Sequence, residues 1–182
     1  MNIVPSLDET FVGVSRQIHS LDRSCRDVLD ACLAKIDEHE SQVRAWVRVD
    51  RDGALRRAAE LDAELAAGHW RGPMHGIPMG IKDIVDVAGF PTAAGSPLLA
   101  NNIATTDAVL VQRLRRAGAV ILGKTVTTQF ASFDPPVTRN PWNLEHVCSL
   151  FKVLQSKLML IQSDMVTEHH RDLTNSASSR FY

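Results

Sequence analysis

The sequence predicts an α/β fold that begins with helices and continues into a β-α-β unit of an incomplete mixed sheet covered by helices. Two observations predict it. Apolar residues recur at helical spacing in the first third of the chain. Farther on, two short apolar runs flank an amphipathic stretch that ends in glycine, and parallel strands are usually joined by such a crossover helix. Because parallel sheets are normally covered on both faces, two strands do not complete one, and further strands are expected.

Residues 24–38 predict the first amphipathic helix. Ser24 precedes it and is a residue type that caps helix N-termini. The apolar positions at helical spacing are Val28, Leu29, Cys32, Leu33 and Ile36. Cys25 and Cys32 are expected to face the same way on this helix. With Cys148 they make an odd number of cysteines without a Cys-x-x-Cys spacing, which indicates reduced thiols rather than a zinc site or a redox pair.

A short extended stretch and a second helix are expected next. The extended stretch is Trp46–Val49. The helix that follows is rich in alanine and leucine, and its apolar positions include Leu55, Leu61 and Leu65. Asp50 or Asp52 is expected to cap its N-terminus. Gly68 stands where a glycine commonly ends a helix.

Residues 77–84 predict the first strong strand, after a loop over residues 69–78. Side chains alternate across a strand and divide this one into two faces, with Ile77, Met79 and Ile81 on one and Pro78, Gly80 and Lys82 on the other. Lys82 is therefore expected to project beside a glycine and a proline. Such small neighbours leave room for a ligand or another backbone. On these residues alone, a surface lysine, or one paired with Asp83 or Asp86, remains an alternative.

A third helix and a second strand complete the predicted unit. Thr106 and Asp107 are expected to cap the helix, which runs to Ala117 and stops at Gly118. Residues 119–122 then predict a short buried strand. The two strands are expected to be parallel.

The composition of the chain changes near residue 146. All ten glycines lie at or before Gly123 and all eight prolines at or before Pro141, so the later residues lack turn punctuation. We therefore divide the chain into residues 1–146 and a tail of residues 147–182. The tail carries apolar residues at helical spacing, which predict an amphipathic helix: Leu150, Leu154, Leu158, Ile161 and Met165. From Thr167 onward disorder is expected.

Charge and composition exclude several classes of partner. Lys plus Arg (20) nearly balance Asp plus Glu (21), so nothing indicates direct binding to nucleic acid or to an anionic membrane. The start of the sequence lacks the features of a secretory signal, and no apolar run is long enough to span a bilayer. We expect a cytoplasmic protein. His169 and His170 are adjacent and are not expected to bind zinc.

One stretch and its continuation carry a recognisable motif. Residues 72–83 read Gly-Pro-Met-His-Gly-Ile-Pro-Met-Gly-Ile-Lys-Asp, and Ala94-Gly-Ser96 follows. Further on come Ile121-Leu-Gly-Lys-Thr125 and Thr138-Arg-Asn-Pro-Trp-Asn-Leu-Glu-His146. In order and approximate spacing these segments resemble the N-terminal part of the amidase-signature family. The resemblance covers residues 14–146 and is strongest from Gly72 onward.

The resemblance implies the amidase-signature fold and an amide hydrolase with a Ser–cis-Ser–Lys triad, in which Lys82 is the catalytic lysine. Such an enzyme converts a small-molecule amide into a carboxylate and ammonia or an amine through an acyl-enzyme. It implies no metal and no organic cofactor. A lysine has an ordinary pKa of about 10.4, so it acts as a base only where burial disfavours its charge.

The resemblance ends after His146. There the family continues with a Pro-Gly-Gly-Ser-Ser-Ser-Gly type of segment, which supplies both serines and oxyanion donors, whereas this chain reads Val147-Cys-Ser-Leu-Phe-Lys152. The nearby residues Ser149, Ser176, Ser178, Ser179 and Cys148 lack the glycine-rich turn or neighbouring base that a nucleophile requires. Two smaller departures are Val126 in place of a common asparagine and Gln129 in place of a frequent glutamate.

These observations lead to one main hypothesis and three alternatives. The main hypothesis is an amidase gene interrupted by frameshift, insertion or truncation, whose product is inactive. The first alternative is a fragment of the glutaminase subunit of a transfer-RNA amidotransferase. The second is a non-catalytic module that binds a homologous or partner subunit through its tail helix. The third is complementation, in which another polypeptide supplies the serine segment.

Overall fold

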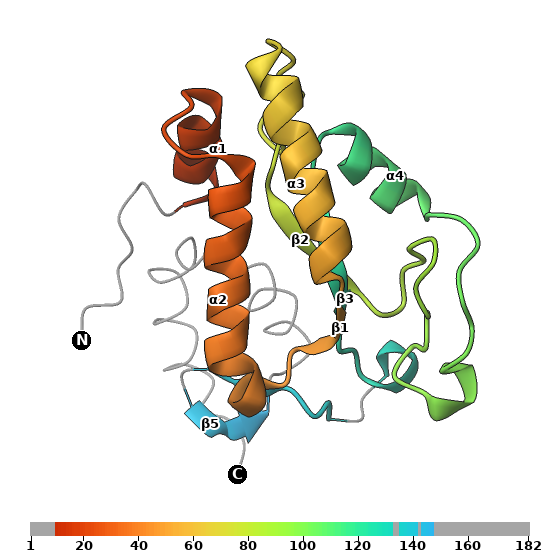
Figure 1. The fold of residues 1–182 in the computed structure, drawn as a ribbon. Coiled ribbons are helices and arrows are strands. Elements are labelled where there is room, and N and C mark those ends of the chain that lie inside the picture. The colour runs from red at the N-terminus through yellow and green to blue at the C-terminus, as the bar shows by residue number, and fades with distance from the viewer. Residues whose placement is uncertain (1–9, 133–134, 142, 148–182) are drawn as a thin grey trace, which may run out of the picture.

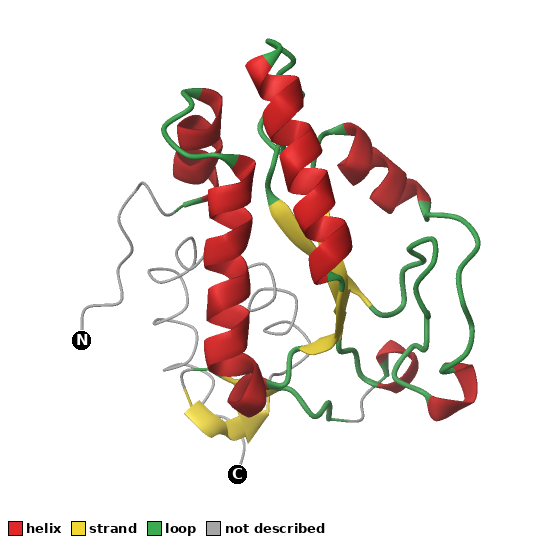
Figure 2. Ribbon diagram, viewed as in Figure 1, coloured by secondary structure: helices red, strands yellow, loops and turns green. Residues whose placement is uncertain are grey.

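The computed structural model describes residues 10–132, 135–141 and 143–147. The described helices are α1 (Phe11–His19), α2 (Cys25–Val43), α3 (Arg51–Ala66) and α4 (Val109–Arg116), with short 3-10 helices at Pro97–Leu99 and Gln129–Ala131. The strands are β1 (Trp46–Val49), β2 (Pro78–Lys82), β3 (Val120–Thr125), β4 (Arg139–Asn140) and β5 (Asn143–Val147). Figure 2 shows the helices arranged around the small central sheet. None of the helices so described has the length and apolar composition that a bilayer crossing requires.

The central sheet has the strand order β1-β3-β2. Strand β2 pairs with β3 in parallel, and the chain between them includes α4, so the predicted β-α-β unit is confirmed. Strand β1, the predicted extended stretch, pairs with β3 in the antiparallel sense and makes the sheet mixed. Strands β4 and β5 form a separate antiparallel pair. Among the described residues β2 is hydrogen-bonded on one side only, so its other edge is open.

Helix α2 confirms the first predicted helix. Ser24 accepts a hydrogen bond from the Asp27 N–H, and the Asp27 carboxylate accepts one from the Ser24 N–H, which forms a capping box. All five apolar positions predicted for this helix are buried. Cys25 and Cys32 face the same core as free thiols. Helix α1 was not predicted, because its nine residues include only a short apolar pattern, although Val14 and Ile18 are buried.

The boundaries of the next helices are partly as predicted. Asp50 caps α3 by accepting a hydrogen bond from the Gly53 N–H, and Gly68 follows the helix with a φ of 81°. Helix α4 ends before Gly118 as predicted, but Asp107 does not cap its N-terminus. The Asp107 carboxylate instead accepts hydrogen bonds from the Ala88 N–H and the Arg115 side chain. Asp107 therefore ties the loop after β2 to α4.

The sheet separates two apolar clusters. The larger cluster joins α1, α2 and α3 to one face, and the smaller one joins α4 and the loop after β2 to the other face. Figure 1 shows α2 and α3 side by side, with α4 beyond α3. Ile77 packs in the larger cluster and Ile81 in the smaller one, so the prediction that both share a face is wrong. Ile77 precedes the first residue of β2, and the register of β2 and β3 shifts after Met79.

The boundary predicted at residue 146 falls within β5, which ends at Val147. The predicted tail helix and the disorder expected after Thr167 lie outside the described residues.

Candidate active site

Lys82 is the last residue of β2, and its side chain is half-buried. Its ammonium group forms no hydrogen bond or ion pair with any of the residues that the structure describes. The sequence-based alternative, a salt bridge between Lys82 and Asp83, is not formed, because Asp83 pairs with another lysine. The amine of Lys82 is thus available to a group from outside the described part of the chain.

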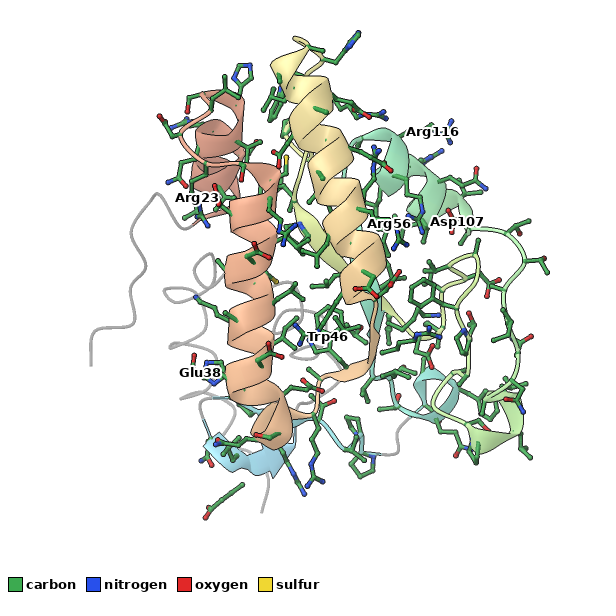
Figure 3. All side chains as sticks on the ribbon, viewed as in Figure 1. Arg23, Glu38, Trp46, Arg56, Asp107 and Arg116 are labelled. Atoms are coloured by element: carbon green, nitrogen blue, oxygen red, sulfur yellow. The ribbon has the colours of Figure 1, made fainter. Side chains whose placement is uncertain are left out.

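Lys82 belongs to a row of side chains on one face of the sheet. Thr125 of β3 is paired with Lys82 on one side and with Trp46 of β1 on the other, and partners in a sheet share a face. A Cβ atom placed on Gly80 would lie 2.8 Å from the Trp46 ring and 2.7 Å from the Thr125 methyl group. The space expected beside Lys82 is therefore filled at Gly80 by two side chains of this chain. Figure 3 shows Trp46 between α2 and the sheet.

The fully buried lysine of this region is Lys124 on β3, which is 1% exposed. Its Nζ lies 3.1 Å from Asp83 Oδ1, and it donates hydrogen bonds of 3.0 Å to the Pro91 carbonyl and to Thr92 Oγ1. The contact with Asp83 is an ion pair rather than an aligned hydrogen bond, since Oδ1 accepts none. Three oxygen atoms thus surround this ammonium group. Such an arrangement offsets the cost of burying a charge.

Two loops pack together beyond the ends of β2 and β3. The Ala94 N–H donates to the Asp83 carbonyl (2.9 Å), and the Phe130 N–H donates to the Ala94 carbonyl (2.7 Å). The Gln129 side-chain amide lies 3.5 Å from Ser96 Oγ, which is buried. Ala94, Phe130 and Ala131 all have positive φ values, between 49° and 56°. Residues other than glycine rarely adopt this conformation, and such strain concentrates at functional sites.

Several buried polar groups at this end of the sheet have no hydrogen-bond partner. They are Trp46 Nε1, Thr127 Oγ1 and Thr128 Oγ1. Thr127 and Thr128 are 5% and 8% exposed and follow β3 directly. Buried groups of this kind are normally satisfied. The region around Lys82 therefore offers several hydrogen-bonding groups besides its amine.

The structure does not place the serines and the cysteine that follow His146. Ser149, Ser176, Ser178, Ser179 and Cys148 lie outside the described residues, so their distance from Lys82 is not defined. Across residues 10–132, 135–141 and 143–147, no group of three His, Cys, Asp or Glu side chains is placed to hold a metal ion.

Comparison with known proteins identifies the family. The profile described as Amidase matches residues 27–149, which is more than half of the chain.

The chain belongs to the amidase family. It is 43% identical over 134 residues to an amidase from Pseudomonas putida, covering 72% of this chain and 28% of the relative. It is 40% identical over 146 residues to a glutamyl-tRNA(Gln) amidotransferase subunit from Acidothermus cellulolyticus, covering 76% and 28%. Among solved structures, the native peptide amidase from Stenotrophomonas maltophilia superposes with a TM-score of 0.71 at 33% identity, covering 78% and 32%.

This amidase-family chain spans about three tenths of the length of the relatives that it matches. A bacterial aryl acylamidase of the amidase-signature family, 21% identical with a TM-score of 0.76, supports the same fold. The predicted fold class is thus confirmed, and the chain corresponds to the helical start and the first part of a larger mixed sheet.

The motifs of this amidase-family chain indicated Lys82 but gave no role to Lys124. The predicted strand stopped at Leu122, whereas β3 continues to Thr125 and is buried throughout. A signal was present in the sequence: a lysine in one parallel strand and an aspartate at the end of its neighbour meet at the same edge of a sheet. The side chain of Gln129, a departure from the family pattern, lies beside Ser96, and the Val126 N–H donates to the Ala45 carbonyl.

Proposed function

We propose that this chain is the lysine-bearing part of an amide hydrolase, in which Lys82 is the catalytic base, and that it does not hydrolyse amides by itself. The observation that carries the proposal is the free amine of Lys82 at the end of a strand, beside strained loops and buried polar groups without partners. Membership of the amidase family supports the reaction class.

The environments of the two strand lysines support this assignment. A protonated lysine has three donors and no acceptor, so an ammonium group already surrounded by oxygens is poorly suited to take a proton. Lys124 is in that situation, with three oxygens within 3.1 Å. Lys82 has no such partners in the described part of the chain. Of these two lysines, Lys82 is the one suited to proton transfer.

The proposed reaction is acyl transfer to a serine. The neutral amine of Lys82 takes a proton through a bridging serine, a second serine attacks the amide carbon, and ammonia or an amine leaves. Water then releases the carboxylic acid. Backbone N–H groups of a glycine- and serine-rich segment stabilise the oxyanion, with about 2.7–4 kcal/mol for each donor. Residues 147–182 contain no glycine, so we propose that this segment is missing and that the chain is inactive alone.

The second candidate function is that of a glutaminase in a transfer-RNA amidotransferase. The relative from Acidothermus cellulolyticus supports it, because its identity to this chain is close to that of the Pseudomonas putida amidase. In that case the chain corresponds to part of a glutaminase subunit that acts together with a partner subunit. Its substrate is then the side-chain amide of glutamine rather than another small amide. We also propose a cytoplasmic location, which the buried free thiols of Cys25 and Cys32 support.

A fusion protein tests the proposed function. Residues 1–146 are joined to the part of the Pseudomonas putida amidase that lies beyond its matched region, and ammonia release is measured with simple amides and with glutamine. We expect hydrolysis by the fusion and a loss of about 10²–10⁴-fold in the Lys82→Ala fusion, as for removal of a general base. Lys35→Ala is the control, because Lys35 is exposed on α2.

Two outcomes would contradict the proposal. Hydrolysis by the unmodified chain that disappears in Lys82→Ala contradicts its inactivity. An active fusion that tolerates Lys82→Ala contradicts the role of Lys82.

A further inference from the structure

Asp83 follows Lys82 directly but points to the other face of the sheet. Ile81 and Lys124 are paired across β2 and β3, and Lys82 is paired with Thr125. Because side chains alternate along a strand, Asp83 and Lys124 share the face opposite to Lys82. The Asp83 side chain is 2% exposed there, against Lys124. The carboxylate nearest to Lys82 in the sequence is therefore held away from it.

The backbone of Asp83 is fixed on both sides. Its N–H donates to the Thr125 carbonyl (3.0 Å), and its carbonyl accepts from the Ala94 N–H (2.9 Å). Lys124 in turn is fixed by the Pro91 carbonyl and by Thr92 Oγ1, at 3.0 Å each. The ion pair thus joins β3, the end of β2 and the turn that leads to Ala94. Asp83 cannot rotate toward Lys82 without breaking it.

The charge of Lys124 has a consequence for Lys82. A buried carboxylate without a partner is costly, so Asp83 requires a cation nearby. If Lys124 were neutral, the ammonium group of Lys82, on the adjacent residue, would be the nearest replacement. An amine held in an ion pair is not available to take a proton from a serine.

We propose that Lys124 is a positioning residue for Lys82: it holds the Asp83 carboxylate on the opposite face of the sheet, so that the Lys82 amine stays free of its neighbour's charge. The catalytic meaning of this arrangement rests on the proposed function. The arrangement itself is testable in the full chain without any hydrolysis.

The experiment measures the acetylation rate of Lys82 in the folded 182-residue chain. Limiting isotope-labelled acetic anhydride is added, and peptide mass spectrometry gives the rate of Lys82 relative to that of Lys35, which is exposed on α2. The variants are Lys124→Met, Lys124→Gln and the double variant Asp83→Asn/Lys124→Met. The double variant removes both charges, which is often close to neutral for stability. All proteins are measured in the same stabilising osmolyte, with folding checked by circular dichroism.

We expect both single variants to lower the relative rate of Lys82 about fivefold, the effect of a partly exposed ion pair of about 1 kcal/mol. The double variant is expected to return the rate to within about twofold of the original, since no carboxylate remains to capture the amine. His75→Gln is the matched control. It disturbs a buried side chain that hydrogen-bonds to the Leu61 carbonyl at 3.0 Å, and it is expected to leave the Lys82 rate unchanged.

A purely structural role of the ion pair predicts other results. An unchanged Lys82 rate in folded single variants would overturn the proposal. So would single variants that do not fold even in the osmolyte beside a double variant that folds with an unchanged rate. The outcome is separate from the proposed function, because a fusion without Lys82-dependent hydrolysis would refute the catalytic role and leave the acetylation result standing.

Discussion

Lys82 and Lys124 project from opposite faces of the same sheet, one strand apart, and differ in every feature of their surroundings. Lys124 is buried against Asp83, whereas Lys82 is half-buried without a partner among the described residues. Adjacent parallel strands thus separate two tasks that one residue type performs. Lys124 contributes to stability, and Lys82 is left for chemistry.

The first prediction contrasts the stability effects of the two lysines. Lys124→Met leaves the buried Asp83 carboxylate unpaired, which is expected to lower the free energy of unfolding by about 3–5 kcal/mol. Lys82→Met removes no interaction of the described part and is expected to change it by less than about 0.5 kcal/mol. Urea unfolding followed by circular dichroism measures both. Equal losses in the two variants would contradict the difference in burial between the two side chains.

The second prediction concerns the close approach of β1 and β3 at Gly123. A Cβ atom there would lie 2.0 Å from the Arg48 carbonyl oxygen, so a side chain forces the two backbones apart. Gly123→Ala is expected to lower the free energy of unfolding by more than about 2 kcal/mol. Gly89→Ala is the control. Gly89 also has a positive φ, of 82°, but nothing lies within 4 Å of its Cβ position, so it is expected to cost about 1 kcal/mol from backbone strain alone.

The same urea experiment separates these two costs. A Gly123→Ala variant no less stable than Gly89→Ala would mean that β1 moves away from β3 without a penalty.

The helices and the parallel strands were predictable because local chemistry determines them. Ser24 and Asp50 cap α2 and α3, and Gly68 and Gly118 end their helices, as residue type and spacing indicate. Helix α1 was missed because a nine-residue helix shows too little periodicity. Asp107 was misassigned because its carboxylate is used in a tertiary contact with Ala88 and Arg115, which no local pattern records.

The candidate site was predictable only in part. The family motif indicates Lys82, but motif spacing does not show which lysine is buried. Lys124 is buried because β3 runs three residues beyond the predicted strand, and its partners Pro91, Thr92 and Asp83 come from distant positions in the sequence. The space expected beside Gly80 was filled by Trp46 for the same reason, since cross-strand neighbours depend on register.

The third prediction concerns pH. A hydrogen bond from Arg71 (2.8 Å) and the positive charge of that residue lower the pKa of Glu64. Arg71 also donates to the Arg116 carbonyl (3.3 Å), so the pair links α3 to the end of α4. A carboxylate whose pKa is lowered by folding stabilises the folded state above its unfolded pKa, about 4.3, and the contribution is lost as pH falls through the folded value.

Glu64→Gln is therefore expected to be less stable than the original chain at pH 7, and the difference is expected to shrink below about pH 4. Urea unfolding at several pH values measures this. Glu38→Gln, at an exposed position of α2, is the control and is expected to change stability little at any pH. A Glu64→Gln difference that grows on acidification would contradict the assigned sign.

The fourth prediction concerns the thiols of α2. Burial, with a smaller contribution from a hydrogen bond to Asp62, raises the pKa of Cys25 to about 12, and burial raises that of Cys32 to about 11. The thiolate is the reactive form, so a raised pKa lowers reactivity in addition to the effect of restricted access. Both thiols are therefore expected to resist iodoacetamide at pH 8 in the folded chain and to react fully in urea. Peptide mass spectrometry distinguishes each site, including Cys148, which lies outside the described residues. Alkylation of Cys25 at the same rate with and without urea would show that α2 does not pack on the core as described, because Cys25 is 0% exposed there.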